Sequence, residues 1–361
     1  MKSIDESLAF VSAGGRKTIL RPTMKILGFE FAPVFIPLER RIQTACVFQW
    51  ALCFLCMGFG SLAVFIYLLF TEYYFIPLAY LMWYIYDFNT CEQGGRRLLW
   101  QFNNPVWKYF ADYFPIKLIK TAELDPSKNY IVGYHPHGIM SAGAFANFAT
   151  NATDFNQMFP KMHQYLCILT GQFRFPFFRE YLMSSGCCAV SKNSLNWLLN
   201  QKEKGKFITI VVGGAVEAIE ANPGKFKLKI KKRKGFIKLA LQHGTPLIPV
   251  YSFGENDLFL QLSSEKRQWL KWFQMKFTKF IGFSPVIFHG RGIFNYTFGI
   301  VPFRKPINTV VGKPIEVPLI ENPSKEQVEE VHKIYLNSLY ELFEEYKGKY
   351  GIDEMNHLIF E

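Results

Sequence analysis

The amino-acid sequence predicts an α/β domain that follows a membrane-inserted helical hairpin. The first observation is an uncharged run of 26 residues, Ala45 to Phe70, which is long enough to span the hydrocarbon core of a bilayer. The second is an amphipathic helical segment, 234–244, between two strand-like runs; strand, helix and strand in this order indicate a parallel crossover. The third is the set of short apolar runs, rich in β-branched residues, that are typical of buried strands: 129–134, 207–212, 246–253 and 308–311.

A second apolar run, Tyr73 to Tyr86, would return the chain through the membrane. It follows Thr71 and Glu72, has only 14 residues and contains Pro77, so by length it is a marginal span. A re-entrant or interfacial segment is therefore the alternative to a full crossing. A buried helical pair of a soluble protein is the non-membrane interpretation. A cleaved signal peptide is excluded, because the first run begins too far into the chain and is too long.

Basic residues flank the hairpin, and none lies in its turn. Arg40 and Arg41 precede it, whereas Arg96 and Arg97 follow it. The positive-inside rule then places both flanks, and the rest of the chain, in the cytosol. The predicted organisation is an N-terminal cytosolic segment (1–41), a membrane hairpin (42–88) and a cytosolic domain (89–361).

The composition favours an anionic partner and reduced thiols. The formal net charge of +12 suits nucleic acid, an anionic membrane surface or a phosphorylated substrate. Nucleic acid fits a protein with a membrane hairpin poorly, so none is expected. The seven cysteines are odd in number and scattered, which argues against a disulfide framework.

Two more helices are predicted in the cytosolic domain. Residues 176–186 form one, which would close at Gly186, just as Gly244 would stop the segment 234–244. The other is amphipathic, lies near the C-terminal end and begins at Ser324 as a candidate N-cap. Its apolar stripe is Val328, Val331, Tyr335, Leu339 and Leu342.

Two histidines follow the strand predicted at 129–134. Active sites of open α/β sheets lie beyond the carboxyl ends of the strands, and His135 and His137 lie there. Pro136 favours extended geometry at His135, and residues i and i+2 of an extended chain point the same way. We therefore expect both imidazoles to face one cavity, as general-base candidates. A pair of structural histidines at a turn is the alternative. No third metal ligand stands at a convincing spacing, so no metal is expected.

A second block follows the strand predicted at 207–212. Gly213 and Gly214 would expose backbone N–H groups that stabilise an oxyanion or accept a phosphate. No G-K-[ST] follows, so the block is not a P-loop. Glu217 is a candidate to orient a histidine or to hold a substrate hydroxyl; an ordinary glutamate in the first turn of a helix is the alternative.

A third block, Lys225 to Lys238, is strongly basic. Lysines 225, 227, 229 and 231 alternate with apolar residues, which predicts a strand with one cationic side. That side would bind phosphate groups or the anionic bilayer surface. An edge strand that lysines protect from aggregation explains the alternation equally well.

Four blocks in one order resemble the family of type 2 diacylglycerol acyltransferases and monoacylglycerol acyltransferases. They are YHPHG (134–138), IVVGGAVEAI (210–219), RKGFIKLALQHGTPLIPVYSFGEND (233–257) and FHGRGIF (288–294). The resemblance covers nearly the whole chain from about Phe29 and includes the hairpin. The segments 29–44, 120–131 and 223–228 look most like the monoacylglycerol branch.

The resemblance implies a glycerolipid-acyltransferase-like cytosolic domain and names site residues. His135, Pro136, His137 and Gly138 match the family's essential motif, and Glu217 is implied as the histidine's partner. The aspartate of the more distant glycerol-phosphate acyltransferases is missing, which leaves the orienting role to Glu217. Backbone N–H groups near Gly138 or Gly213 and Gly214 would hold the oxyanion. Which histidine is the base stays open.

Substrate-binding residues are implied in the same way. The phosphates of acyl-CoA would lie near Lys231, Arg233 and Lys234, with Arg291 of the last block as a further candidate. The family's neutral-lipid-binding motif, Phe-Leu-x-Leu, is only partly present, because Met57 replaces the second leucine. Phe54 and Leu55 are therefore the two lipid-binding candidates.

The expected reaction is acylation of 2-monoacylglycerol by acyl-CoA, which yields diacylglycerol and free CoA. No metal or nucleotide cofactor is expected, because thioester chemistry needs none. One alternative is a diacylglycerol acyltransferase that makes triacylglycerol. The alternative of a different class is a non-catalytic protein that anchors a basic domain to a membrane.

The resemblance also implies a cellular location. The chain is expected to be a multi-pass protein of the endoplasmic reticulum membrane, in contact with its lipids, with the catalytic domain facing the cytosol. Perinuclear or lipid-droplet association and a homo-oligomer stay open.

Overall fold

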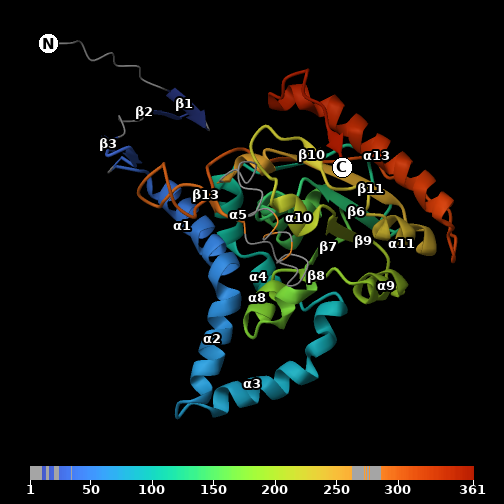
Figure 1. Ribbon diagram of the computed structural model, residues 1–361, viewed down its shortest axis with the longest axis horizontal. Coiled ribbons are helices and arrows are strands. Elements are labelled where there is room, and N and C mark those ends of the chain that lie inside the picture. Colours follow the sequence, from blue (N-terminus) through green and yellow to red (C-terminus); the bar gives the residue numbers. More distant parts are fainter. Residues whose placement is uncertain are drawn as a thin grey trace.

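The computed structural model describes residues 10–13, 16–19, 24–33, 35–261 and 286–361, together with the isolated positions 272, 274 and 276. Within these residues the chain forms a mixed α/β structure from which a pair of apolar helices projects (Figure 1). The α/β class predicted from the sequence is thus confirmed.

A seven-stranded sheet is the centre of the fold. Its order is β5 (Lys117–Lys120), β14 (Asn308–Val311), β11 (Leu247–Phe253), β6 (Tyr130–His135), β9 (Lys206–Val211), β7 (His163–Ile168) and β8 (Cys187–Ala189). The strands from β11 to β8 are parallel, whereas β14 runs antiparallel to β11 and parallel to β5. All four strand-like runs recognised in the sequence are strands of this sheet, and every residue of β6 and β11 is buried, as expected of central parallel strands.

Helices cover both faces of the sheet. Because successive side chains of a strand point to opposite faces, neighbouring residues of β6 pack against different helices. On one face, Ile131 of β6 joins a core with α9 (Lys192–Asn200), α11 (Gly235–His243) and α13 (Lys325–Lys347). On the other, Val132 and Tyr134 join a core with α1 (Leu38–Leu52), α5 (Pro105–Tyr113) and α8 (Phe178–Ser184). Figure 1 shows α9, α11 and α13 on the side of the sheet away from α1.

The three helices predicted for the cytosolic domain are present. α11 ends at His243, and Gly244 after it adopts the left-handed conformation (φ +57°) that a C-terminal glycine provides. α13 begins with a capping box in which Ser324 and Gln327 satisfy each other's backbone N–H groups. α8 ends at Ser184, two residues before the predicted stop.

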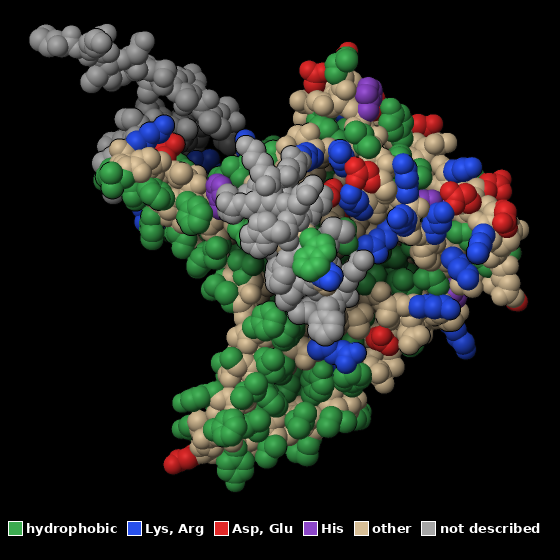
Figure 2. All heavy atoms as spheres, in the orientation of Figure 1, with side chains coloured by type: hydrophobic (Ala, Val, Ile, Leu, Met, Phe, Trp, Pro, Cys, Tyr) green, Lys and Arg blue, Asp and Glu red, His purple; other side chains and the backbone are tan. Residues whose placement is uncertain are grey.

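The long apolar run forms one continuous helix, Leu38–Leu69, composed of α1, the π-helical turn η1 (Cys53–Met57) and α2 (Gly58–Leu69). It is the one helix of the described residues that is long and apolar enough to cross a membrane. Its first half packs on the domain, where Trp50 lies 5.0 Å from Phe110 of α5 between ring centroids. Its second half and α3 (Phe75–Tyr86) expose apolar side chains over most of their surface (Figure 2), which is compatible with a membrane protein.

The remaining described elements are short. The strands are β1 (Phe10–Ala13), β2 (Arg16–Ile19), β3 (Met24–Ile26), β4 (Phe29–Phe31), β10 (Lys227–Leu228), β12 (Leu260–Gln261), β13 (Phe288–His289) and β15 (Ile359–Phe360). The helices are η2 (Phe88–Glu92), α4 (Leu99–Phe102), α6 (Ala142–Ala144), η3 (Phe145–Ala149), α7 (Phe155–Met158), η4 (Thr170–Arg174), α10 (Gly214–Ala218), η5 (Glu255–Asp257) and η7 (Gly348–Tyr350).

Candidate active site

The candidate site lies where three adjacent parallel strands end. β6 ends at His135, β9 at Val211 and β11 at Phe253, and the loops that follow meet at one edge of the sheet. These loops carry the histidine block, the double-glycine block and the segment that begins η5.

His135 and His137 do not face the same cavity. His135 is the last residue of β6, is fully buried, and points to the α13 side, where its Nε2 lies 3.0 Å from the hydroxyl of Tyr335. The Tyr335 hydroxyl donates in turn to Gly133 O at 3.2 Å. Burial lowers the pKa of His135 to about 3. The expectation of two imidazoles in one cavity was wrong, because the strand ends at His135 and the rule for residues i and i+2 does not extend beyond it.

His137 is partly exposed and lines an apolar cavity. Its Nδ1 lies 3.0 Å from Gly138 O. A carbonyl oxygen can only accept, so Nδ1 carries the proton in the neutral ring and Nε2 keeps its lone pair. Nε2 has no hydrogen-bond partner among the described residues. Burial lowers the pKa of His137, which favours this neutral form. The arrangement is that of a general base.

Glu217 holds the backbone at His137. The N–H of His137 donates to its Oε1 at 2.6 Å, and the N–H of Lys229 donates to its Oε2 at 2.9 Å. Burial raises the pKa of this carboxyl, and the two backbone donors oppose the rise. The side chain folds back over Gly213, where a Cβ would lie 2.3 Å from the carboxylate, so only glycine fits there. The structure brings Glu217 and His137 together, but through the main chain.

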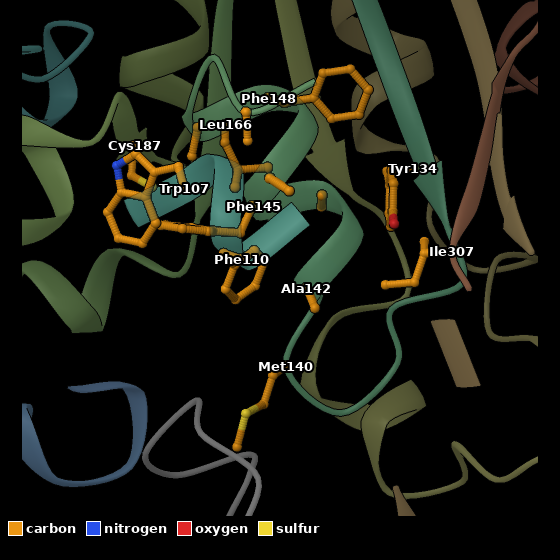
Figure 3. Close-up of a cluster of buried hydrophobic side chains, with 14 of the residues drawn as sticks. Trp107, Phe110, Tyr134, Met140, Ala142, Phe145, Phe148, Leu166, Cys187 and Ile307 are labelled. Atoms are coloured by element: carbon orange, nitrogen blue, oxygen red, sulfur yellow. The ribbon is translucent and has the colours of Figure 1, made fainter. Parts of the chain in front are cut away.

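The cavity beside His137 has a volume of about 370 Å³ and mainly apolar walls. The helix Leu38–Leu69 closes one side with Trp50, Phe54 and Leu55, so both lipid-binding candidates lie in the same cavity as the histidine. Gly214 lines it too, whereas Gly213 does not. The other walls include Ile139, Met140, Phe145, Leu166, Phe178, Tyr181, Leu182, Cys187, Val190, Ala215, Ala218, Val286 and Phe288. Figure 3 shows Met140 on the loop below Ala142, and Phe145, Leu166 and Cys187 grouped on the opposite side.

The basic candidates differ in their surroundings. Lys231 and Arg233 are exposed, and one Arg233 Nη lies 3.8 Å from the position of a Cβ on Gly214, beside the cavity. Lys234 is paired with Glu329. Arg291 is buried, donates to Gly292 O at 3.1 Å, and has its guanidinium carbon 4.4 Å from the Tyr296 ring centroid.

The cationic strand is shorter than predicted. Its alternation is confirmed, since Leu228 and Ile230 are buried while Lys227 and Lys231 are exposed, but only Lys227–Leu228 pairs as a strand, with β15. Lys229 pairs with Glu220 and Glu361, which neutralise part of the cationic face.

Sequence reasoning missed Glu255, a buried carboxyl under the histidine turn. Its Oε2 accepts from the Tyr134 hydroxyl at 2.7 Å and from the Gly143 N–H at 2.9 Å. Burial raises its pKa to about 7. Glu255 follows β11 by two residues, so the strand-end rule that singled out Glu217 could also have found it. No group of three or more possible metal-ligating side chains occurs in the described part of the chain.

Comparisons with known proteins agree with the sequence resemblance. The family model for diacylglycerol acyltransferase matches residues 66–361. The chain is 53% identical to 2-acylglycerol O-acyltransferase 1 of Bos taurus over 331 residues, which are 92% of this chain and 99% of that protein. The human protein of that name is 50% identical over 91% and 98%. Human diacylglycerol O-acyltransferase 2 is 48% identical over 88% and 82%.

One solved structure is similar at a distance. The 1-acyl-sn-glycerophosphate acyltransferase PlsC from Thermotoga maritima matches 84% of this chain and 97% of its own, with 12% identity and a TM-score of 0.38. That likeness is too slight to carry an argument, and the family rests on the sequence matches. The expectation of an acyltransferase is confirmed: the chain belongs to the diacylglycerol acyltransferase family.

Proposed function

We propose that this protein transfers a fatty acyl group from acyl-CoA to 2-monoacylglycerol and releases diacylglycerol and free CoA. The observation that carries this proposal is His137, which lines an apolar cavity that a membrane-type helix also lines and whose Nε2 has no hydrogen-bond partner within the described part of the chain. The names of the relatives support the acceptor, since those at 53% and 50% identity are 2-acylglycerol O-acyltransferases.

In the proposed mechanism His137 is the general base. Its Nε2 accepts the proton of the acceptor hydroxyl, and the oxygen attacks the thioester carbonyl carbon. The C–S bond of the tetrahedral intermediate then breaks, and the thiolate takes the proton from the imidazolium. Glu217 acts by holding the main chain of His137. Backbone N–H groups near Gly138 or Gly213 and Gly214 are the proposed oxyanion donors. His135 is proposed to support the site through Tyr335.

The substrates are proposed to meet at the mouth of the cavity. Acyl chains suit its apolar walls, including Phe54 and Leu55. The phosphates of CoA suit the exposed cations Lys231 and Arg233, because Arg233 lies beside Gly214. Lys234 is a weaker candidate because it pairs with Glu329, and Arg291 is weaker because its guanidinium donates to backbone carbonyls. No metal or nucleotide cofactor is part of this proposal.

We further propose that the hairpin, within residues 42–88, enters the endoplasmic reticulum membrane from the cytosolic side and turns inside it. The helix Leu38–Leu69 is long enough to cross a bilayer, but its first part, α1, packs on the domain, which leaves α2 and α3 as the inserted arms. Each has 12 residues, which corresponds to about 18 Å of helix. The hydrocarbon core is about 30 Å thick. A hairpin of this length would reach into one leaflet and return, which leaves the segment 1–41 and the acyltransferase domain 89–361 in the cytosol.

The proposal is tested by acyl transfer in membranes that contain the full chain. Labelled acyl-CoA is offered with 2-monoacylglycerol, 1-monoacylglycerol, diacylglycerol, fatty alcohol or lysophospholipid. Diacylglycerol formed from 2-monoacylglycerol supports the proposal. Triacylglycerol formed only from added diacylglycerol would replace it with the activity named for the 48% identical relative. No transfer to any acceptor by folded, membrane-inserted protein would favour a non-catalytic anchor.

A further inference from the structure

Glu255 is a buried acid, and only one of its two carboxyl oxygens accepts hydrogen bonds from the described residues. The side chain is 2% exposed. Its Oε2 accepts hydrogen bonds from the Tyr134 hydroxyl and the Gly143 N–H, while Oε1 has no hydrogen-bond partner among the residues that the structure describes. A buried carboxyl oxygen without a partner lowers stability, and such groups are concentrated at functional sites. A buried acid that lowers the stability of the fold in this way is therefore a candidate for a functional role.

The carboxyl lies directly under the turn that carries His137. A Cβ on Gly138 would be 2.8 Å from Cγ of Glu255 and 3.2 Å from its Oε1. A Cβ on Gly143 would be 2.5 Å from the Tyr134 hydroxyl and 2.6 Å from Oε2 of Glu255. In Figure 3 the Tyr134 hydroxyl points toward the space between Ala142 and Ile307. Both glycines therefore allow the backbone to rest on the Glu255–Tyr134 pair.

The segment between these two contacts is strained and tied to the histidine. Ser141 has φ +53°, a left-handed conformation that is strained for a residue with a side chain and persists only where its surroundings impose it. Its hydroxyl donates to the carbonyl of His137 at 2.8 Å. The N–H of Gly143, two residues further on, is held by Glu255. The main chain of His137 is thus fixed at its N–H by Glu217 and at its carbonyl by a segment that Glu255 secures.

We propose that Glu255, together with Tyr134, positions His137 for catalysis by holding the segment 138–143 from beneath; this inference rests on the acyl transfer proposed above. Neither side chain lines the cavity, so the pair acts on the rate and not on substrate binding. Tyr134 is the only titratable side chain within hydrogen-bonding distance of Glu255 in the described part of the chain, and Asp257 of the same turn interacts with Lys305.

The test compares Tyr134→Phe, Glu255→Gln and the double variant with the wild type in membranes. Both single changes preserve size, and Tyr134→Phe removes one hydroxyl, so it is expected to fold even if Glu255→Gln does not. We expect kcat to fall about 10- to 100-fold in each, because a small displacement of a catalytic group has effects of this size. The KM values for acyl-CoA and for the acceptor should stay within twofold. The double variant should lose no more than the worse single variant, because both changes act on the same contact. Tyr134→Phe removes its donor, and Glu255→Gln removes the charge of its acceptor, whose amide oxygen can still accept.

The control is Glu316→Gln, which removes an exposed carboxylate that pairs with Lys128 at 2.8 Å. Its kcat and its melting temperature should match those of the wild type. Two results would overturn the inference: a kcat per folded molecule within twofold of wild type in Tyr134→Phe, or single losses that multiply in the double variant. Absence of transfer by the wild type would instead refute the proposed function, so the two failures are distinguishable.

Discussion

The carboxylate of Glu217 accepts the main-chain N–H of His137 at 2.6 Å, while the imidazole Nδ1 of that residue faces Gly138 O. Glu217 therefore fixes the position of the His137 main chain, whereas the carbonyl of Gly138 sets the tautomer of the ring. This differs from a dyad in which a carboxylate contacts the imidazole directly.

Glu217→Gln should lower kcat while the protein still folds. An amide has one acceptor oxygen, so it can satisfy the N–H of His137 or that of Lys229, but its NH2 group would oppose the other donor. One buried N–H left unpaired costs about 1–3 kcal/mol. Steady-state acyl transfer and thermal unfolding measure the two effects. Glu220→Gln, which changes an acid that pairs with the side chain of Lys229, serves as the comparison. Equal kcat values for the two variants would contradict the role of Glu217.

Gly138→Ala should lower both activity and stability. The residue has φ +61°, and a Cβ there would lie 2.8 Å from Glu255. Strain at a positive φ costs about 1–3 kcal/mol, and the clash adds to it. The matched control is Gly351→Ala, which shares a positive φ (+75°) but has nothing within 4 Å of its Cβ. Thermal unfolding should therefore show a larger loss for Gly138→Ala, and kcat should fall only in that variant. Similar behaviour of the two variants would argue against the close contact with Glu255.

Activity should fall in two steps as pH decreases. The pKa of Glu255 is raised to about 7, so its protonation weakens the charge-assisted bonds from Tyr134 and Gly143 near that pH. The pKa of His137 is lowered, so the base takes up its proton only below about 6.5. A kcat profile of Glu255→Gln should lack the first step and keep the second. Identical profiles for the variant and the wild type would show that protonation of Glu255 does not cause the first loss of activity.

Phe54→Ala should raise the KM for lipid substrates and leave kcat nearly unchanged. Phe54 lines the cavity but belongs to the membrane-type helix and not to the loops that carry the reacting groups. Loss of an aromatic wall removes binding that ground state and transition state share. Ile66→Ala, on the exposed part of the same helix, is the control. If both variants changed KM alike, the cavity would not be the lipid-binding site.

The sequence predicted the fold well where local patterns decide it. Buried strands such as 247–253 and the capped helix at Ser324 follow from runs of apolar residues and from side-chain capping, both visible within a few residues. The start of the apolar helix was harder to predict from the sequence. The helix begins at Leu38, before the uncharged run, and its first part buries Val47 and Trp50 against the domain. Lipid and a protein core select the same apolar residues, so composition alone does not separate the two.

The sequence could predict most residues of the site, but not how their side chains are oriented. Strand ends and glycines pointed to His137, Gly214 and Glu217, and the structure gathers them at one sheet edge. The orientation of His135 depends on Tyr335, 200 residues away in sequence, which no local pattern reveals. The position of Glu255 just after a strand could single it out, but its contacts with the backbone at Gly138 and Gly143 form only in the folded chain.

His137, and not His135, is the proposed general base. The most direct measurement is single-turnover acyl transfer by His137→Ala and His135→Ala in membranes, with folding checked by thermal unfolding. We expect a loss of about 10²–10⁴-fold in the chemical step for His137→Ala with a near-normal melting temperature. For His135→Ala we expect a lower melting temperature and a smaller loss per folded molecule, because that ring packs at Tyr335. Full activity of folded His137→Ala would show that His137 is not the general base.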